Sequence, residues 1–155
     1  MLYYAGDGYL LRYVIAPFLV SLFLAAGLTY VLRPLSRRLG ILDRPGEHKQ
    51  HGVPTPTLGG ISVFCAFLAG CFASGPLSPS LQVILQAAAV LVIVGCCDDI
   101  WGVSAKLKLG ALFLGTVWMW LHGLHLHAFG WSGLAALLLT FLWVGLISSS
   151  FNGVD

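Results

Sequence analysis

The run YVIAPFLVSLFLAAGLTYVL, from Tyr13 to Leu32, contains twenty residues without a charged side chain. An α-helix rises about 1.5 Å per residue, so such a helix would be about 30 Å long, which is the thickness of the hydrocarbon core of a bilayer. Backbone groups cannot stay unpaired in lipid, and the run lacks the alternation of a barrel strand. The run therefore predicts a transmembrane helix.

The rest of the chain repeats this pattern. Of its 155 residues, 58% are hydrophobic and 9% are charged, whereas a soluble domain carries roughly 25% charged residues. The net charge of +2 is too small to imply a nucleic-acid surface, and the chain has no basic run of five or more residues. We expect an all-α, polytopic transmembrane helical bundle with about five spans. The expected spans are residues 13–32, 58–75, 81–97, 107–129 and 133–151.

The basic residues predict the orientation of these spans. Seven of the eight Lys and Arg residues fall between spans one and two or between spans three and four, and only Arg12 falls on the other side. Because positive loops stay in the cytoplasm, we expect the N-terminus outside and the C-terminus in the cytoplasm. The seven residues are Arg33, Arg37, Arg38, Arg44, Lys49, Lys106 and Lys108. Nearly all acidic residues share the cytoplasmic side in this topology.

The first cytoplasmic loop ends in a glycine pair, Gly59-Gly60, at the start of the second span. The first N–H groups of a helix have no partner within it, which suits a phosphate, and Lys49 and His51 could add side-chain donors. The alternative is a basic loop that only fixes topology and meets anionic lipid.

The pair Asp98-Asp99 directly follows the third expected span. Adjacent carboxylates repel each other and oppose the dipole at the end of a helix, so a cation nearby would stabilise them. Magnesium prefers such oxygen ligands and shares its coordination with substrate phosphates. The alternative is a pair of solvated residues at a helix end.

A third polar cluster, Ser148 to Asp155, follows the last expected span. Its Asn-Gly step is a common turn signal. Asn152 and Asp155 are of interest because the expected topology places them on the same side as Asp98 and Asp99.

These three clusters, in this order, resemble the polyprenyl-phosphate N-acetylhexosamine-1-phosphate transferase family, and especially its undecaprenyl-phosphate N-acetylglucosamine-1-phosphate branch. The resemblance covers essentially the whole chain and rests on three segments. They are D-x-P-x-x-x-K-x-H with P-T-P-x-x-G-G (Asp43, Pro45, Lys49, His51, then 54–60), D-D-x-x-G (Asp98, Asp99, Gly102), and N-x-x-N-x-x-D (Ser149, Asn152, Asp155).

The resemblance implies transfer of a sugar 1-phosphate, expected to be N-acetylglucosamine 1-phosphate, from a UDP-sugar to a polyprenyl phosphate. The reaction releases UMP at the cytoplasmic face of the inner membrane and initiates synthesis of a cell-envelope polysaccharide. The lipid bilayer supplies the acceptor, and Mg²⁺ or Mn²⁺ is the expected cofactor. No nucleic-acid partner is expected, and a homodimer is compatible with this interpretation.

The implied site roles fall into three groups. Asp98, Asp99 and Asp155 are the expected catalytic residues, and Asp98, Asp99 and Asn152 the expected metal ligands. Which carboxylate is the base and which the ligand stays open. The expected substrate-binding residues are Lys49, His51, Thr55, Thr57, Gly59, Gly60, Lys106 and Asn152.

The chain departs from the family pattern in two respects. Ser149 replaces the first Asn of the third motif, and the chain ends at Asp155, whereas family members continue with further helices and another metal-binding aspartate. We therefore expect residues 1–155 to be the N-terminal part of a single transferase domain, inactive alone.

Two other classes of function are compatible with the residues by themselves. One is a cation transporter or channel subunit with Asp98 and Asp99 in its ion path, although transport sites usually lie near the bilayer midplane. The other is a noncatalytic membrane scaffold.

Overall fold

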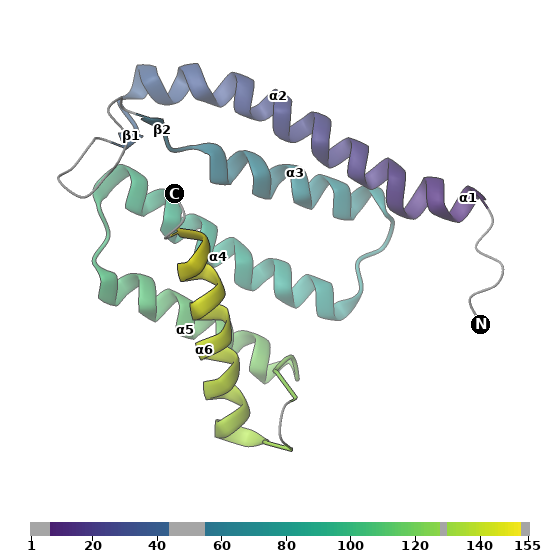
Figure 1. Ribbon diagram of the computed structural model, residues 1–155, viewed down its shortest axis with the longest axis vertical. Helices are drawn as coiled ribbons and strands as arrows, with labels where there is room; N and C mark the ends of the chain where they lie inside the picture. Colours follow the sequence, from purple (N-terminus) through teal and green to yellow (C-terminus); the bar gives the residue numbers. More distant parts are fainter. Residues whose placement is uncertain (1–6, 44–54, 128–129, 153–155) are drawn as a thin grey trace. The chain divides into compact units, whose positions relative to one another are not determined.

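The computed structural model describes residues 7–43, 55–127 and 130–152, and the fold is helical (Figure 1). Its long first helix is continuous through α1 (Asp7–Leu10), a π-helical segment η1 (Leu11–Ile15) and α2 (Ala16–Leu39). Two short strands, β1 (Leu42–Asp43) and β2 (Thr55–Pro56), precede four further helices. These helices are α3 (Gly59–Ala73), α4 (Pro79–Trp101), α5 (Ala105–Leu121) and α6 (Gly133–Asn152).

Three of these helices are long and apolar enough to cross a membrane. They comprise residues Gly8–Leu39, Pro79–Trp101 and Gly133–Ser150, and α3 is a shorter apolar helix. At most 17% of the residues in each apolar window are buried inside the protein, which is the pattern of helices whose apolar surface faces lipid. The expected fold class is confirmed: the chain is a multi-pass helical membrane protein. Among the described residues, three of the five expected spans are long and apolar enough to cross, and the orientation of the spans stays a prediction.

The chain divides into two compact units. The first contains residues 1–77 together with 96–102, and the second contains residues 78–95 and 103–155. Helix α4 therefore contributes its last turns to the first unit and its remainder to the second.

The first helix extends beyond the expected span of residues 13–32. Its π-helical turn, in which the Ala16 N–H donates to the carbonyl of Leu11, lies just before Pro17. A proline has no N–H to continue the regular ladder, which explains a wider turn at this place. The helix ends only at Gly40, whose φ of 70° is left-handed and favours glycine.

This longer helix corrects the expected position of three basic residues. Arg33, Arg37 and Arg38 lie on α2 and not in the loop after it. Charged side chains are compatible with a helix where it leaves the hydrocarbon, so the first charge does not end the helix. The left-handed cap at Gly40 does.

Helices α2 and α3 lie side by side and antiparallel (Figure 1). The face of α3 that meets α2 carries small residues four positions apart: Ser62 and Ala66 are 0% and 1% exposed, and Gly70 is also buried. A side chain on Gly70 would collide with the Ser21 hydroxyl and would lie 2.9 Å from the Pro17 carbonyl oxygen. Such close backbone approach is how membrane helices gain packing energy.

At the C-terminal end of α2, a buried serine forms hydrogen bonds with the residue that precedes β1. Ser36 is 0% exposed, its hydroxyl donates to the Ile41 carbonyl, and its own carbonyl accepts the Ile41 N–H at 3.0 Å. β1 then pairs antiparallel with β2, with Leu42 opposite Pro56. This pairing holds Asp43 and Thr55 side by side, and α3 begins four residues after Thr55.

In the second unit, small residues again allow close contact. A Cβ on Gly115 of α5 would lie 3.7 Å from the Ala87 carbonyl oxygen of α4. Farther along the same helices, the indole N–H of Trp118 donates to Gln86 Oε1 at 3.1 Å. A hydrogen bond between side chains is an effective link between helices that lipid surrounds.

Helix α5 packs on α6 through an edge-to-face pair, Phe113 with Phe141, whose ring centroids are 5.5 Å apart. The expected fourth span, 107–129, is wrong in its second half, since α5 ends at Leu121 and Gly123 has a φ of 77°. The following turn is held by a hydrogen bond from the Leu126 N–H to Thr140 Oγ1 of α6 at 2.9 Å.

Candidate functional site

The paired carboxylates lie on the last turn of α4. The sequence placed Asp98 and Asp99 after the helix, but the helix continues to Trp101. Gly102 caps it, with a φ of 69°, and the Gly102 N–H donates a hydrogen bond of 2.9 Å to the Asp98 carbonyl. Asp98 is half-buried and Asp99 is exposed. Both interact with neighbouring groups. The helix therefore holds the two carboxylates at its end instead of leaving them on a loose segment.

The end of α4 and the start of α3 belong to the same compact unit. Within this unit Cys96 of α4 lies near Cys65 of α3, and Asp99 follows Cys96 by about one turn. Cys65 is less than two turns after the start of α3, and Cys96 is about one and a half turns before the end of α4. The glycine pair of α3 and the carboxylates of α4 are thus at the same end of this unit.

The start of α3 offers unsatisfied donors. Its N-cap residue is Leu58, which has no side-chain oxygen to cap the first N–H groups, and the first turn contains no acidic residue. Gly59 and Gly60 face open space, since a Cβ on either would meet nothing within 4 Å. Just before them, the buried Thr57 hydroxyl has no hydrogen-bond partner among the described residues. An acceptor such as a phosphate oxygen would suit this end of the helix.

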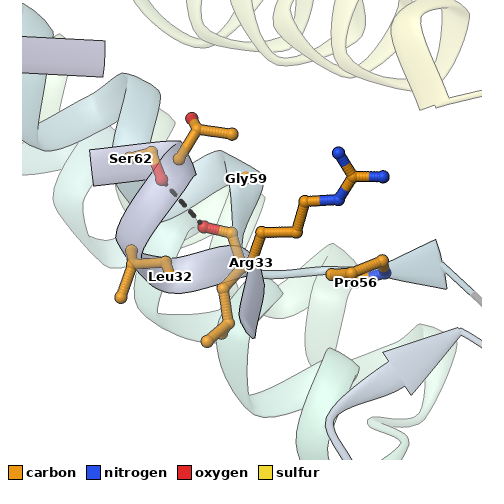
Figure 2. A pocket seen from close by; sticks show the side chains of 7 residues that line it. Leu32, Arg33, Pro56, Gly59 and Ser62 are labelled. Carbon is orange, nitrogen blue, oxygen red and sulfur yellow. Dashed lines mark hydrogen bonds between the residues drawn. The ribbon is translucent and has the colours of Figure 1, made fainter. Parts of the chain in front are cut away.

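A cavity of about 270 Å³ lies beside this helix start, between α2 and α3 (Figure 2). Apolar groups form most of its wall, together with one cation, Arg33, and two hydroxyl residues, Thr29 and Ser62. The Ser62 hydroxyl donates to the Leu58 carbonyl within α3 at 3.4 Å. The complete lining is Thr29, Leu32, Arg33, Pro56, Leu58, Gly59 and Ser62.

The sequence did not identify this cavity. It placed Arg33 in a loop and treated Thr29 and Leu32 as part of a lipid-facing span, because the first charge was taken as the end of the helix. Gly40 is the signal that could have corrected this, since a glycine after a helical pattern marks a helix end.

The other expected site residues are distributed over the chain. Thr55 lies in β2 opposite Asp43 of β1. Lys106 is exposed on the first turn of α5, and Asn152 is the last residue of α6, so both belong to the second unit. The expected residues Lys49, His51 and Asp155 lie outside the described residues. The structure therefore places Asp98, Asp99 and the segment from Thr55 to Gly60 in one compact unit. That these residues, together with the remaining ones, form a site stays a prediction.

The donor atoms at the end of α4 are of the kind that magnesium prefers. Asp98 and Asp99 supply hard carboxylate oxygens on consecutive residues, and Mg²⁺ commonly takes only one or two protein carboxylates, with water and phosphate completing its shell. Within residues 7–43, 55–127 and 130–152, no group of three or more His, Cys, Asp or Glu side chains forms a metal cage. A two-carboxylate site that shares its ion with a phosphate fits these residues.

Curated proteins with similar sequences carry one kind of name. The chain is 30% identical over 96% of its length to a probable undecaprenyl-phosphate N-acetylglucosaminyl 1-phosphate transferase of Bacillus subtilis (strain 168). It is 32% identical over 81% of its length to the undecaprenyl-phosphate α-N-acetylglucosaminyl 1-phosphate transferase of Yersinia pestis, and 31% identical over 88% to that of Escherichia coli (strain K12). The chain spans 37–44% of the length of these relatives.

No protein-family profile matches the chain, and no solved structure matches it. The relatives nevertheless agree with the resemblance that the three motifs carry, and their names describe neither a transporter nor a scaffold. By sequence, this chain is a homologue of the undecaprenyl-phosphate N-acetylglucosaminyl 1-phosphate transferases, and the expected family is confirmed.

Proposed function

We propose that the protein transfers N-acetylglucosamine 1-phosphate from a UDP-sugar to a polyprenyl phosphate at the cytoplasmic face of the inner membrane. In this reaction an oxygen of the lipid phosphate forms a bond to the sugar-bearing phosphorus of the donor. The bond from that phosphorus to the bridging oxygen breaks, and UMP leaves. The product is a lipid-linked diphospho-sugar, which would initiate synthesis of a cell-envelope polysaccharide.

The observation that carries this proposal is the presence of Asp98 and Asp99 at the same end of one unit as the uncapped start of α3. Joining two phosphates requires positive charge or N–H donors between two anions, and a carboxylate to hold a cation or accept a proton. The start of α3 supplies N–H groups at Gly59 and Gly60, and the end of α4 supplies the carboxylates. A site at a membrane boundary also allows a lipid acceptor to meet a water-soluble donor.

The residues of this chain have distinct proposed roles. Asp98 or Asp99 orients or deprotonates the acceptor phosphate, and the pair holds a divalent cation, which supplies charge neutralisation when bound. Lys49, His51 and the segment 55–60 contact phosphate or nucleotide. Lys106 adds a positive charge near the carboxylates along the chain. Asn152 and Asp155 contact the metal or the uridine nucleotide.

The test is an assay of UMP release by the purified protein, expressed from its complete gene and supplied with UDP-N-acetylglucosamine and polyprenyl phosphate. We expect release that depends on both substrates, stops with EDTA and returns with excess Mg²⁺. UDP-N-acetylgalactosamine and UDP-glucose serve as competing donors. Formation of a lipid-linked sugar without UMP, or no reaction with any donor in folded protein, would contradict the proposal.

A further inference from the structure

The cavity between α2 and α3 combines one cation with an apolar wall. The uncharged run of α2 ends at Leu32, so Arg33 is the first charged residue beyond the hydrocarbon-spanning part of this helix. Thr29 lies one turn earlier, within the run. The cavity therefore extends from the apolar region of the helix to its charged end. A ligand that fits it must have a hydrocarbon part at one end and a charged group at the other.

The Arg33 side chain is available to such a ligand. It is exposed, and within the described part of the chain no hydrogen bond or ion pair to its guanidinium is found. Figure 2 shows it extending from α2 with its guanidinium directed away from the ribbon, while the dashed line marks only the Ser62 bond. A guanidinium presents several donors in a plane, which match the oxygens of a phosphate.

Two further features favour an anion at this place. The N-cap residue Leu58 leaves the first N–H groups of α3 without a side-chain partner, and Gly59, which lines the cavity, has open space on its Cβ side. These donors and Arg33 are therefore on the wall of one cavity. Leu32, Pro56 and Leu58 supply the apolar part of that wall.

The size of the cavity limits the ligand. Its volume of about 270 Å³ is just below the range of about 300–1,000 Å³ that holds drug-sized molecules. A phosphate with its first few carbon atoms is of suitable size, whereas a complete nucleotide-sugar is not.

We propose that this cavity is a binding site for a phosphate attached to a hydrocarbon chain, with the phosphate on Arg33 and the start of α3 and the first carbons along Leu32, Pro56 and Leu58. The ligand is either a polyprenyl phosphate or an anionic phospholipid of the bilayer. With a polyprenyl phosphate, the inference deepens the proposed function and rests on it. With a phospholipid, the site is a lipid contact that does not require transferase activity.

The experiment measures binding of soluble probes to the purified protein, expressed from its complete gene and kept in detergent, by microscale thermophoresis. Farnesyl phosphate represents the polyprenyl phosphate, dihexanoyl phosphatidylglycerol represents the phospholipid, and farnesol and inorganic phosphate are the probes that lack one half of the ligand. The variant Arg33→Gln removes the cation, and Thr29→Phe fills the cavity but keeps the charge. Arg38→Gln is the matched control, because Arg38 is an exposed arginine on the same helix that does not line the cavity.

We expect Arg33→Gln to weaken binding of the preferred lipid phosphate about tenfold or more, which is the usual effect of losing one charge-assisted hydrogen bond. Thr29→Phe should also weaken binding, and Arg33→Lys should restore part of the affinity. Arg38→Gln should bind like the unmodified chain. Stronger binding of farnesyl phosphate would identify the acceptor, and stronger binding of phosphatidylglycerol would identify a bilayer lipid.

Equal effects of Arg33→Gln and Arg38→Gln would overturn the proposal, as would equal binding of inorganic phosphate and the two lipid phosphates. These measurements need no turnover. Absence of UMP release together with Arg33-dependent lipid binding would therefore contradict the proposed function and leave this inference standing.

Discussion

Replacing Gly70 by alanine tests whether α2 and α3 pack as the structure describes. The added methyl group would collide with the Ser21 hydroxyl and lie 2.9 Å from the carbonyl oxygen of Pro17. The serine side chain can rotate away, but the carbonyl belongs to the backbone of α2 and can move only if the helix moves. Gly70→Ala should therefore push the two helices apart.

The size of the effect follows from two opposing contributions. Inserting a methyl group into a well-packed contact usually costs about 1–3 kcal/mol. Alanine is a better helix former than glycine by about 1 kcal/mol, which offsets part of that cost. We expect the free energy of separating α2 from α3 to fall by up to about 2 kcal/mol, which raises the population of the open form by up to about 30-fold.

The assay reports on this pair of helices directly. None of the five tryptophans lies on α2 or α3, so their fluorescence does not report directly on this pair of helices. A cysteine at position 62, introduced as Ser62→Cys in a background without the native cysteines, is a suitable reporter because Ser62 is 0% exposed. Its rate of labelling by a small thiol reagent in detergent measures how often the helices separate.

The matched control is Gly27→Ala on α2, where a Cβ would meet nothing within 4 Å. This variant should label at the unmodified rate or more slowly. A second substitution, Ser21→Gly, should recover part of the loss in Gly70→Ala, because it removes the hydroxyl that the new methyl group meets. An unchanged labelling rate in Gly70→Ala would refute this description of the helix contact.

Three other predictions concern the carboxylates, the topology and the second unit. Asp98→Asn and Asp99→Asn should insert and express normally but lower UMP release by the protein from its complete gene about a hundredfold or more, since each removes a charge from the metal or acid–base group; near-normal turnover across a magnesium titration in both would remove the pair from the mechanism. A cysteine at Ser104 should be protected from an impermeant reagent in intact cells and react in inverted vesicles, because the distribution of basic residues predicts that this loop is cytoplasmic; labelling in intact cells would contradict the predicted topology. Thr140→Val preserves shape but removes the acceptor of the Leu126 N–H at 2.9 Å, so the Leu126 amide should exchange its hydrogen at least tenfold faster; unchanged exchange would show that another group holds this turn.

The sequence alone predicted the helical membrane fold, because uncharged runs of this length have no other stable form in lipid. It also singled out Asp98-Asp99 and Gly59-Gly60 as candidate site residues, since they stand out as polar or glycine pairs at the ends of apolar runs. Composition and local pattern were sufficient for both. Both the fold class and these clusters follow from whether lipid or water surrounds each segment. They do not depend on which helix packs against which.

The tertiary structure decided what these patterns could not. The left-handed caps at Gly40 and Gly102 set where two helices end. The first helix therefore runs to Leu39, and Asp98 lies on the last turn of α4. Helix ends depend on backbone geometry, which a count of apolar residues does not contain. Only the packing of α2 against α3 brings Arg33 to the cavity beside Gly59, because contact between segments distant in the chain is a property of the folded molecule.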